Sequence, residues 1–175
     1  HTAIESPGYP PGTYRDLRFQ VSALVTSLNA RGFRRNDRIA LIMQPCAETA
    51  ALLVSVMAGF TAVPFNPRYT AEEFRKSFSQ IGIRAVIAMK DGPGTAAAVA
   101  AAGSIPVIEW IPVPREAGIF ALVPPGTAGS GRVEYAEDSD FVYILQTSGT
   151  TANAKIVPVT QRQLCHNKDM MSRLL

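Results

Sequence analysis

The sequence has little of several features that would mark other classes of protein. Only two cysteines occur among its 175 residues, Cys46 and Cys165, and they lie far apart without a CxxC pattern. A structural zinc site or a disulfide framework is therefore not expected, and a reducing compartment is the default. The longest apolar stretch, residues 50–65, is shorter than the roughly 18–20 residues that cross a bilayer, and no signal-peptide pattern is present.

An excess of one charge is also nearly absent. Seventeen Lys and Arg residues oppose fourteen Asp and Glu residues, which leaves a net charge of +3. Apart from Arg31, Arg34, Arg35 and Arg38, the basic residues are scattered, so a nucleic-acid-binding surface is not expected. These four arginines follow a predicted helix, where they would offset its dipole. We expect a soluble cytoplasmic protein, with the peroxisome as the alternative in a eukaryotic source.

What the sequence does contain is a regular alternation of strand and helix patterns. Strands are predicted over 38–43, 61–65, 83–89 and 105–110, and helices over 13–32, 46–59, 70–81 and 95–102. Two of the helices begin at a threonine that an acidic residue follows three positions later, as in a capping box. Strands that alternate with helices of this length form βαβ units with right-handed crossovers. The prediction is an α/β fold with a mostly parallel sheet and helices on both faces.

Four segments follow from this pattern. Residues 1–12 are predicted to be an irregular arm, 13–110 a repeated βαβ unit, 111–140 an irregular connection with one short strand, and 141–175 a strand, a polar loop, a second strand and a helix. The last helix is predicted to run to Leu175 with an apolar face that no later element covers. The sequence also begins without Met. We therefore expect a fragment of a longer protein, able to self-associate through its apolar faces.

One polar segment, between the predicted strands 141–145 and 155–159, carries the groups for chemistry. Its candidate site residues are Thr147, Ser148, Gly149, Thr150, Thr151 and Lys155. Hydroxyls and backbone N–H groups donate to phosphate oxygens, and a lysine adds a point charge. No His or carboxylate is close in sequence, so the segment suits binding and charge stabilisation of a polyphosphate, not proton transfer. From composition alone, a Ser/Thr-rich turn between strands is the alternative. The spacing is not that of a Walker A motif.

The order Thr147-Ser-Gly-Thr-Thr151 with Lys155 resembles the phosphate-binding signature of the adenylate-forming (AMP-binding) superfamily. Further stretches resemble motifs of that superfamily in the same order, namely Thr13–Leu17, Asp37–Ala40, Ala58–Pro67 and Glu137–Asp140. Within it, Pro64–Tyr69 and Ile119–Leu122 look most like the acyl-CoA synthetase branch near oxalyl-CoA and 4-coumarate–CoA ligases.

The resemblance implies the N-terminal portion of the large domain of the adenylate-forming fold and a two-step ligation. A carboxylate attacks the α-phosphate of Mg-ATP to give an acyl-adenylate and pyrophosphate, and the thiol of coenzyme A then displaces AMP. It implies ATP, Mg²⁺ and coenzyme A as cofactors and a small carboxylic acid as substrate. The candidate site residues would contact the β- and γ-phosphates. The catalytic residues and the acyl pocket would lie beyond Leu175, so no catalytic or metal-binding residue is assigned, and the fragment alone is expected to be inactive.

The segment departs from the family pattern at three positions. Ala152 and Ile156 stand where the family usually has Gly, and Ala154 stands where it has Pro. Alanine adopts a positive φ less readily than glycine, at a cost of about 1 kcal/mol, so a stiffer loop is expected. Two other functions stay open. One is a non-catalytic nucleotide- or anion-binding α/β module, and the other is a structural subdomain that pairs with another chain.

Overall fold

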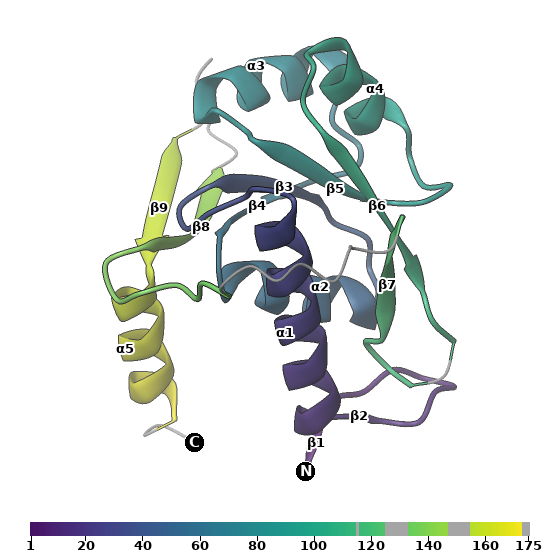
Figure 1. Ribbon diagram of the computed structural model, residues 1–175, viewed down its shortest axis with the longest axis vertical. Helices are drawn as coiled ribbons and strands as arrows, with labels where there is room; N and C mark the ends of the chain where they lie inside the picture. The colour runs from purple at the N-terminus through teal and green to yellow at the C-terminus, as the bar shows by residue number, and fades with distance from the viewer. Residues whose placement is uncertain (115, 125–132, 147–154, 173–175) are drawn as a thin grey trace.

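A mixed sheet runs through the centre of the molecule (Figure 1). The computed structural model describes residues 1–114, 116–124, 133–146 and 155–172. The strands of the sheet are β3 (Arg38–Ile42), β4 (Thr61–Phe65), β5 (Ala85–Met89), β6 (Val107–Pro112), β7 (Phe120–Val123), β8 (Phe141–Gln146) and β9 (Ile156–Thr160). Their spatial order is β7-β6-β5-β3-β4-β8-β9. The five inner strands are parallel, and the edge strands β7 and β9 are antiparallel to their neighbours.

Helices cover both faces of this sheet (Figure 1). α1 (Tyr14–Ala30) and α2 (Ala47–Met57) lie on one face, and α3 (Ala71–Ile81) and α4 (Thr95–Ala102) lie on the other. Alternate residues of β3 point to the two faces: Ile39 and Leu41 belong to the core beneath α1 and α2, whereas Ala40 and Ile42 belong to the core beneath α3. The predicted α/β fold with a mostly parallel, two-sided sheet is confirmed.

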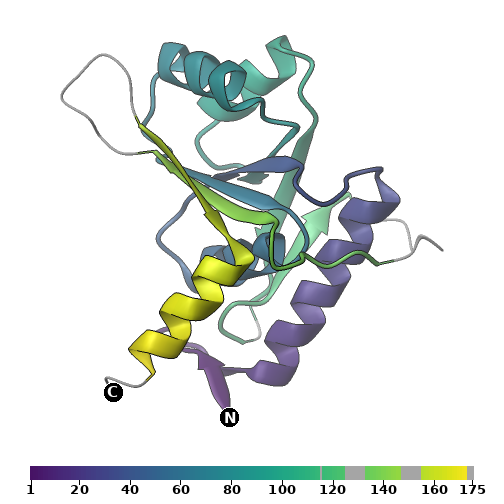
Figure 2. The same ribbon diagram turned by 90° about the vertical axis from the view of Figure 1, so that its left-hand side faces the viewer.

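The helix starts also follow the sequence signals. Thr13, Thr70 and Thr160 are N-caps whose side chains accept a hydrogen bond from the third helical residue, and in each case that residue's side chain accepts a bond from the cap. The final helix differs in length from the prediction. α5 (Gln161–Met171) ends at Met171 with Ser172 as its C-cap, and none of its residues is buried. In Figure 2 it lies on the same side of the sheet as α1.

Arginines hold the helix ends at the amino edge of the sheet. An Nη1 atom of Arg38 donates to the carbonyl oxygen of Ile81, the last residue of α3, at 2.6 Å. Arg34 donates from Nη1 to the carbonyl oxygens of Asn29 and Phe33, both at 3.0 Å, at the end of α1. The expected role at the C-terminus of the preceding helix is confirmed for Arg34, whereas Arg38 binds the C-terminus of the later helix α3.

The N-terminal arm contains a feature that the sequence pattern does not predict. β1 (Thr2–Ile4) pairs antiparallel with β2 (Gly12–Thr13), which leads directly into α1. These strands have three and two residues, too few to show a period-2 pattern in sequence. Within the described part of the chain, no helix combines the length and the apolar character that a membrane crossing requires.

The turn between α2 and β4 is tightly packed around Gly59. A Cβ atom there would lie 3.0 Å from the carbonyl oxygen of Glu134 and 3.1 Å from Cγ1 of Val25. We expect Gly59→Ala to lower the free energy of unfolding by about 1–3 kcal/mol, because neither neighbour can move freely. Gly103→Ala is the matched control, since its Cβ would meet only ordinary contacts from 3.5 Å. Equal urea midpoints for the two variants would contradict this packing.

Candidate functional site

The predicted phosphate-binding segment joins β8 to β9 at the carboxyl edge of the parallel strands. Gln146, the last residue of β8, pairs directly with Ile156, the first residue of β9. Lys155 is exposed and immediately precedes β9. Outside the described residues lie Thr147, Ser148, Gly149, Thr150 and Thr151, so their phosphate contacts stay a prediction. Ligands of open α/β sheets bind at the carboxyl ends of the strands, and the two stems of the segment lie at this edge.

Both stems of this connection contact the side of the sheet that α3 covers. The hydroxyl of Ser77 on α3 donates to Oε1 of Gln146 at 3.2 Å. Ile156 packs against the core that contains Phe74 and Phe78 of the same helix. One stem is therefore fixed by a hydrogen bond and the other by apolar contact.

Two buried amide groups at this edge have hydrogen-bonding capacity left. Nε2 of Gln146 and Nε2 of Gln44, two residues beyond β3, are buried and have no partner among the described residues. More than about nine in ten buried polar atoms in proteins have a partner, so such atoms mark places where a further partner belongs. An amide nitrogen donates, which suits an acceptor such as a phosphate oxygen or a carbonyl.

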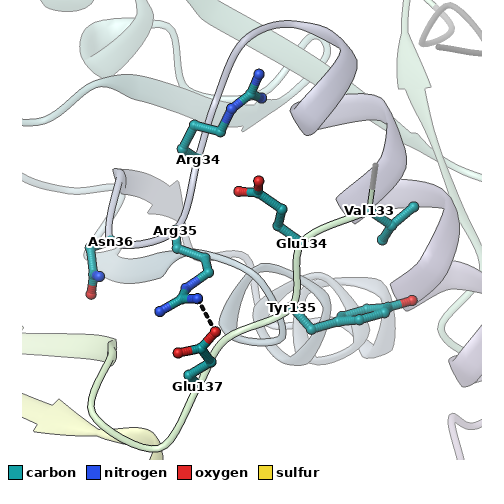
Figure 3. Close-up of a pocket in the computed structure, with 7 residues that line it drawn as sticks. All are labelled: Arg34, Arg35, Asn36, Val133, Glu134, Tyr135 and Glu137. Carbon is teal, nitrogen blue, oxygen red and sulfur yellow. Dashed lines mark hydrogen bonds and ion pairs between the residues drawn. The ribbon is translucent and has the colours of Figure 1, made fainter. Parts of the chain in front are cut away.

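A hollow lies at the opposite, amino edge of the sheet (Figure 3). Its volume is about 560 Å³, and it is lined by Arg34, Arg35, Asn36, Val133, Glu134, Tyr135 and Glu137. Figure 3 shows the Glu134 carboxylate directed between the two arginines. Arg34 already donates to main-chain carbonyls, and Arg35 pairs with the carboxylates of Glu137 and Asp140. Because both guanidinium groups are engaged, this cavity is not the better candidate for an anion.

Asp140 is the centre of the polar network beside this cavity. Its buried carboxylate accepts from Nε of Arg35 at 2.7 Å, from Nδ2 of Asn36 at 2.9 Å and from the backbone N–H of Glu137 at 2.7 Å. Burial raises the pKa of Asp140, but these hydrogen bonds outweigh it and hold the pKa below its ordinary value. The same contact raises the pKa of Arg35, first through Asp140 and then through Glu137. Both groups stay charged, so the pair is structural and does not supply an acid or a base.

Other reactive side chains do not form a competing site in the described part of the chain. No group of three or more His, Cys, Asp or Glu residues there could hold a metal ion. Cys46 and Cys165 are free and exposed, and His166 is exposed on α5. The β8–β9 connection therefore remains the candidate site.

A family model described as AMP-binding enzyme matches residues 1–174. The chain belongs to this family of adenylate-forming enzymes, as its motifs predicted.

Similar proteins act in more than one kind of reaction. A protein of Humulus lupulus named as a probable CoA ligase, CCL9, is 31% identical over 157 residues, which are 87% of this chain and 30% of that protein. Phenyloxazoline synthase MbtB of Mycobacterium sp. (strain MCS) is 28% identical over 149 residues, which are 85% of this chain and 11% of that protein. The chain thus spans less than a third of the length of these relatives.

A solved structure shows the same fold. The crystal structure of ATP-bound MatB from Rhodopseudomonas palustris superimposes with a TM-score of 0.73 at 24% identity, over 95% of this chain and 33% of that one. The predicted adenylate-forming fold is thereby confirmed.

Two contacts do not follow from the sequence pattern: the pairing of Arg35 at the amino edge of the sheet and the bond from Ser77 to Gln146 at the carboxyl edge. The position of Arg35 after a predicted helix suggests a helix-capping role, whereas its guanidinium pairs with carboxylates 102 and 105 positions later. Ser77 was not singled out at all, because a lone serine on a helix carries no signal of its partner. Glu137–Asp140 had been noted only as a family-like stretch.

Asp140 offers a direct test of the polar network. We expect Asp140→Asn to lower the free energy of unfolding by about 1–3 kcal/mol, because the buried acceptor of charge-assisted hydrogen bonds loses its charge. Asp138→Asn is the matched control: its side chain is 75% exposed and lies 3.9 Å from Arg162, so we expect a change near zero. Urea denaturation of both variants measures the difference, and similar losses would contradict the central role of Asp140.

The same carboxylate predicts a dependence on pH. Its pKa in the folded state is below the ordinary value of 3.8, so its contribution is fully present above that value and is lost as the pH falls through the folded pKa. The difference in unfolding free energy between the wild-type chain and Asp140→Asn should therefore be constant at neutral pH and shrink below pH 3.8. A difference that stays constant down to the acid limit would show that the charge is not responsible.

Proposed function

We propose that this chain is part of an ATP-dependent acyl-CoA synthetase, an acid–thiol ligase. In the first step a carboxylate oxygen bonds to the α-phosphorus of ATP, and the bond to the β-phosphate breaks as pyrophosphate leaves. In the second step the sulfur of coenzyme A bonds to the acyl carbon and AMP leaves. Membership of the AMP-binding family supports the first step. The second step, the acid and the cytoplasmic location belong to this proposal.

One observation carries the proposal for this chain's own residues. Lys155 lies exposed beside the pair Gln146–Ile156, at the carboxyl edge where open α/β sheets bind ligands. The hydroxyl-rich residues Thr147 to Thr151 separate Lys155 from Gln146. We propose that these groups hold the β- and γ-phosphates and offset the charge that develops as pyrophosphate departs.

The cofactors differ in how far this chain's residues fit them. The candidate loop is a donor set, with hydroxyls, backbone N–H groups and an ammonium, which suits the phosphates of ATP. Bound ATP supplies the activated phosphorus for attack by the acid. We propose that Mg²⁺ enters with the nucleotide, because the described residues contain no cluster of carboxylates for it. No residue of this chain is assigned to coenzyme A.

The names of the relatives suggest two alternative reactions for the activated acid in the second step. The Humulus lupulus protein is named for ligation to coenzyme A, whereas MbtB is named a phenyloxazoline synthase. We propose coenzyme A as the acceptor because the stretches Pro64–Tyr69 and Ile119–Leu122 resemble those of acyl-CoA synthetases. A carrier-bound thiol in place of coenzyme A would leave the adenylation step unchanged.

Lys155 provides the test of the proposed function. In the full-length protein that contains this chain, we expect Lys155→Ala to slow acid-dependent ATP–pyrophosphate exchange by about 10- to 100-fold, because a charge that stabilises the departing pyrophosphate is removed. Radiolabelled pyrophosphate incorporated into ATP measures the exchange. The longer protein is needed because the chain spans less than a third of its relatives.

Lys168→Ala is the matched control for this test. Lys168 is an exposed lysine on α5 that pairs with Asp169, away from the β8–β9 connection. We expect exchange within twofold of the wild-type rate for this variant. Exchange that is unchanged in Lys155→Ala would overturn the proposed phosphate contact. Exchange without thioester formation on addition of coenzyme A would keep adenylation and exclude coenzyme A as the acceptor.

A further inference from the structure

The contact between Ser77 and Gln146 links α3 to the stem of the candidate phosphate-binding segment. We propose that Ser77 and Gln146 are positioning residues, which set where the chain leaves β8 and thereby where Lys155 is presented to a phosphate. This inference rests on the proposed function for its ligand. The structural part of the inference is that Ser77 of α3 fixes Gln146 at the end of β8, and this part can be tested without any ligand.

α3 is well suited to act as a fixed support. Its first turn is closed by the capping box of Thr70 and Glu73. Its inner face carries Phe74 and Phe78, which are buried and pack against Phe65 at the end of β4, with ring centroids 5.9 and 5.3 Å from that of Phe65. Such aromatic packing fixes the helix against the carboxyl end of the neighbouring strand.

Ser77 lies one residue before Phe78 on α3 and contacts the last residue of β8. Its side chain is half-buried, and its hydroxyl lies 3.2 Å from Oε1 of Gln146, 69 positions later in the chain. Screening by water is reduced at such a position, so the hydrogen bond constrains the Gln146 side chain more than an exposed bond would. The bond therefore adds a polar contact between two elements that already share a core, since Ile144 of β8 belongs to the same buried cluster as Phe74 and Phe78.

The register of the hairpin passes this constraint on to Lys155. Gln146 is directly opposite Ile156, and Lys155 is the residue before Ile156. Ile156 packs against the same core as Phe74 and Phe78. A shift of this pair relative to α3 would therefore move both the point where Thr147 begins and the backbone of Lys155.

The amide of Gln146 has one further atom to satisfy. Its Nε2 is buried without a partner among the described residues. A serine hydroxyl can donate to the amide oxygen or accept from the amide nitrogen, so either orientation of the amide leaves one atom unpaired.

Removal of the Ser77 hydroxyl tests the inference in two ways. In the 175-residue chain without nucleotide, we expect Ser77→Ala to speed hydrogen exchange of the Gln146 and Ile156 amides about three- to tenfold. In the full-length protein, we expect the same variant to raise KM for Mg-ATP about three- to tenfold and to lower kcat less than Lys155→Ala does, because the phosphates are held less accurately while the charge of Lys155 is kept. Ser77→Thr keeps the hydroxyl and should restore both values.

Ser79→Ala is the matched control, because Ser79 is an exposed serine on the same helix. It should change neither exchange at the hairpin nor KM. If hydrogen exchange of the Gln146 and Ile156 amides has the same rate in Ser77→Ala and Ser79→Ala, the inference is overturned, whatever the enzymatic activity. Faster hydrogen exchange in Ser77→Ala with no change in KM for Mg-ATP would also overturn it, because the end of β8 would then not position the ligand. Absence of any ATP–pyrophosphate exchange in the wild-type enzyme would instead count against the proposed function.

Discussion

The arrangement of the candidate site depends on the buried carboxylate of Asp140. Its side chain joins the turn before β3 to the start of β8 through Arg35 and Asn36, and its carbonyl oxygen accepts from the backbone N–H of Gln161 at the start of α5. A second polar bond beside it runs from Oγ1 of Thr61 to the carbonyl oxygen of Phe141 at 2.6 Å. Charge-assisted bonds to a buried group are among the stronger ones in proteins, so this network fixes one end of the β8–β9 hairpin.

At the other end of the hairpin, Ser77 of α3 donates a hydrogen bond to Gln146. Each end of the hairpin is therefore attached to the rest of the fold by polar contacts. One sheet face of the hairpin buries little apolar surface: Phe141, Leu145 and Val157 are each more than 40% exposed. Hydrophobic burial is the main source of stability in most folds, and here it acts mainly on the face that carries Ile144 and Ile156. Polar contacts at Asp140 and Ser77 therefore supplement the one-sided packing of the hairpin at its two ends.

Local sequence signals predicted the fold well because each is read within a few residues. The threonine N-caps, the apolar strand runs and the alternation of strand and helix all have this character, and the structure confirms them. The contacts that position the site do not. Arg35 and Asp140 are 105 positions apart and Ser77 and Gln146 are 69 apart, and neither pair has a spacing that sequence patterns can detect. The phosphate segment stands out by its hydroxyls, glycine and lysine, and its resemblance to a family favours phosphate binding over a Ser/Thr-rich turn.

The polarity of the sheet gives an independent reason to favour the carboxyl edge for an anion. α2, α3 and α4 each follow a parallel strand, so their N-termini lie at this edge and their C-termini lie at the amino edge. Helix N-termini carry partial positive charge and C-termini partial negative charge. At the amino edge the guanidinium groups of Arg34 and Arg38 already donate hydrogen bonds to helix carbonyl oxygens. At the carboxyl edge the helix dipoles and Lys155 act in the same direction, so a phosphate bound there would be stabilised by both.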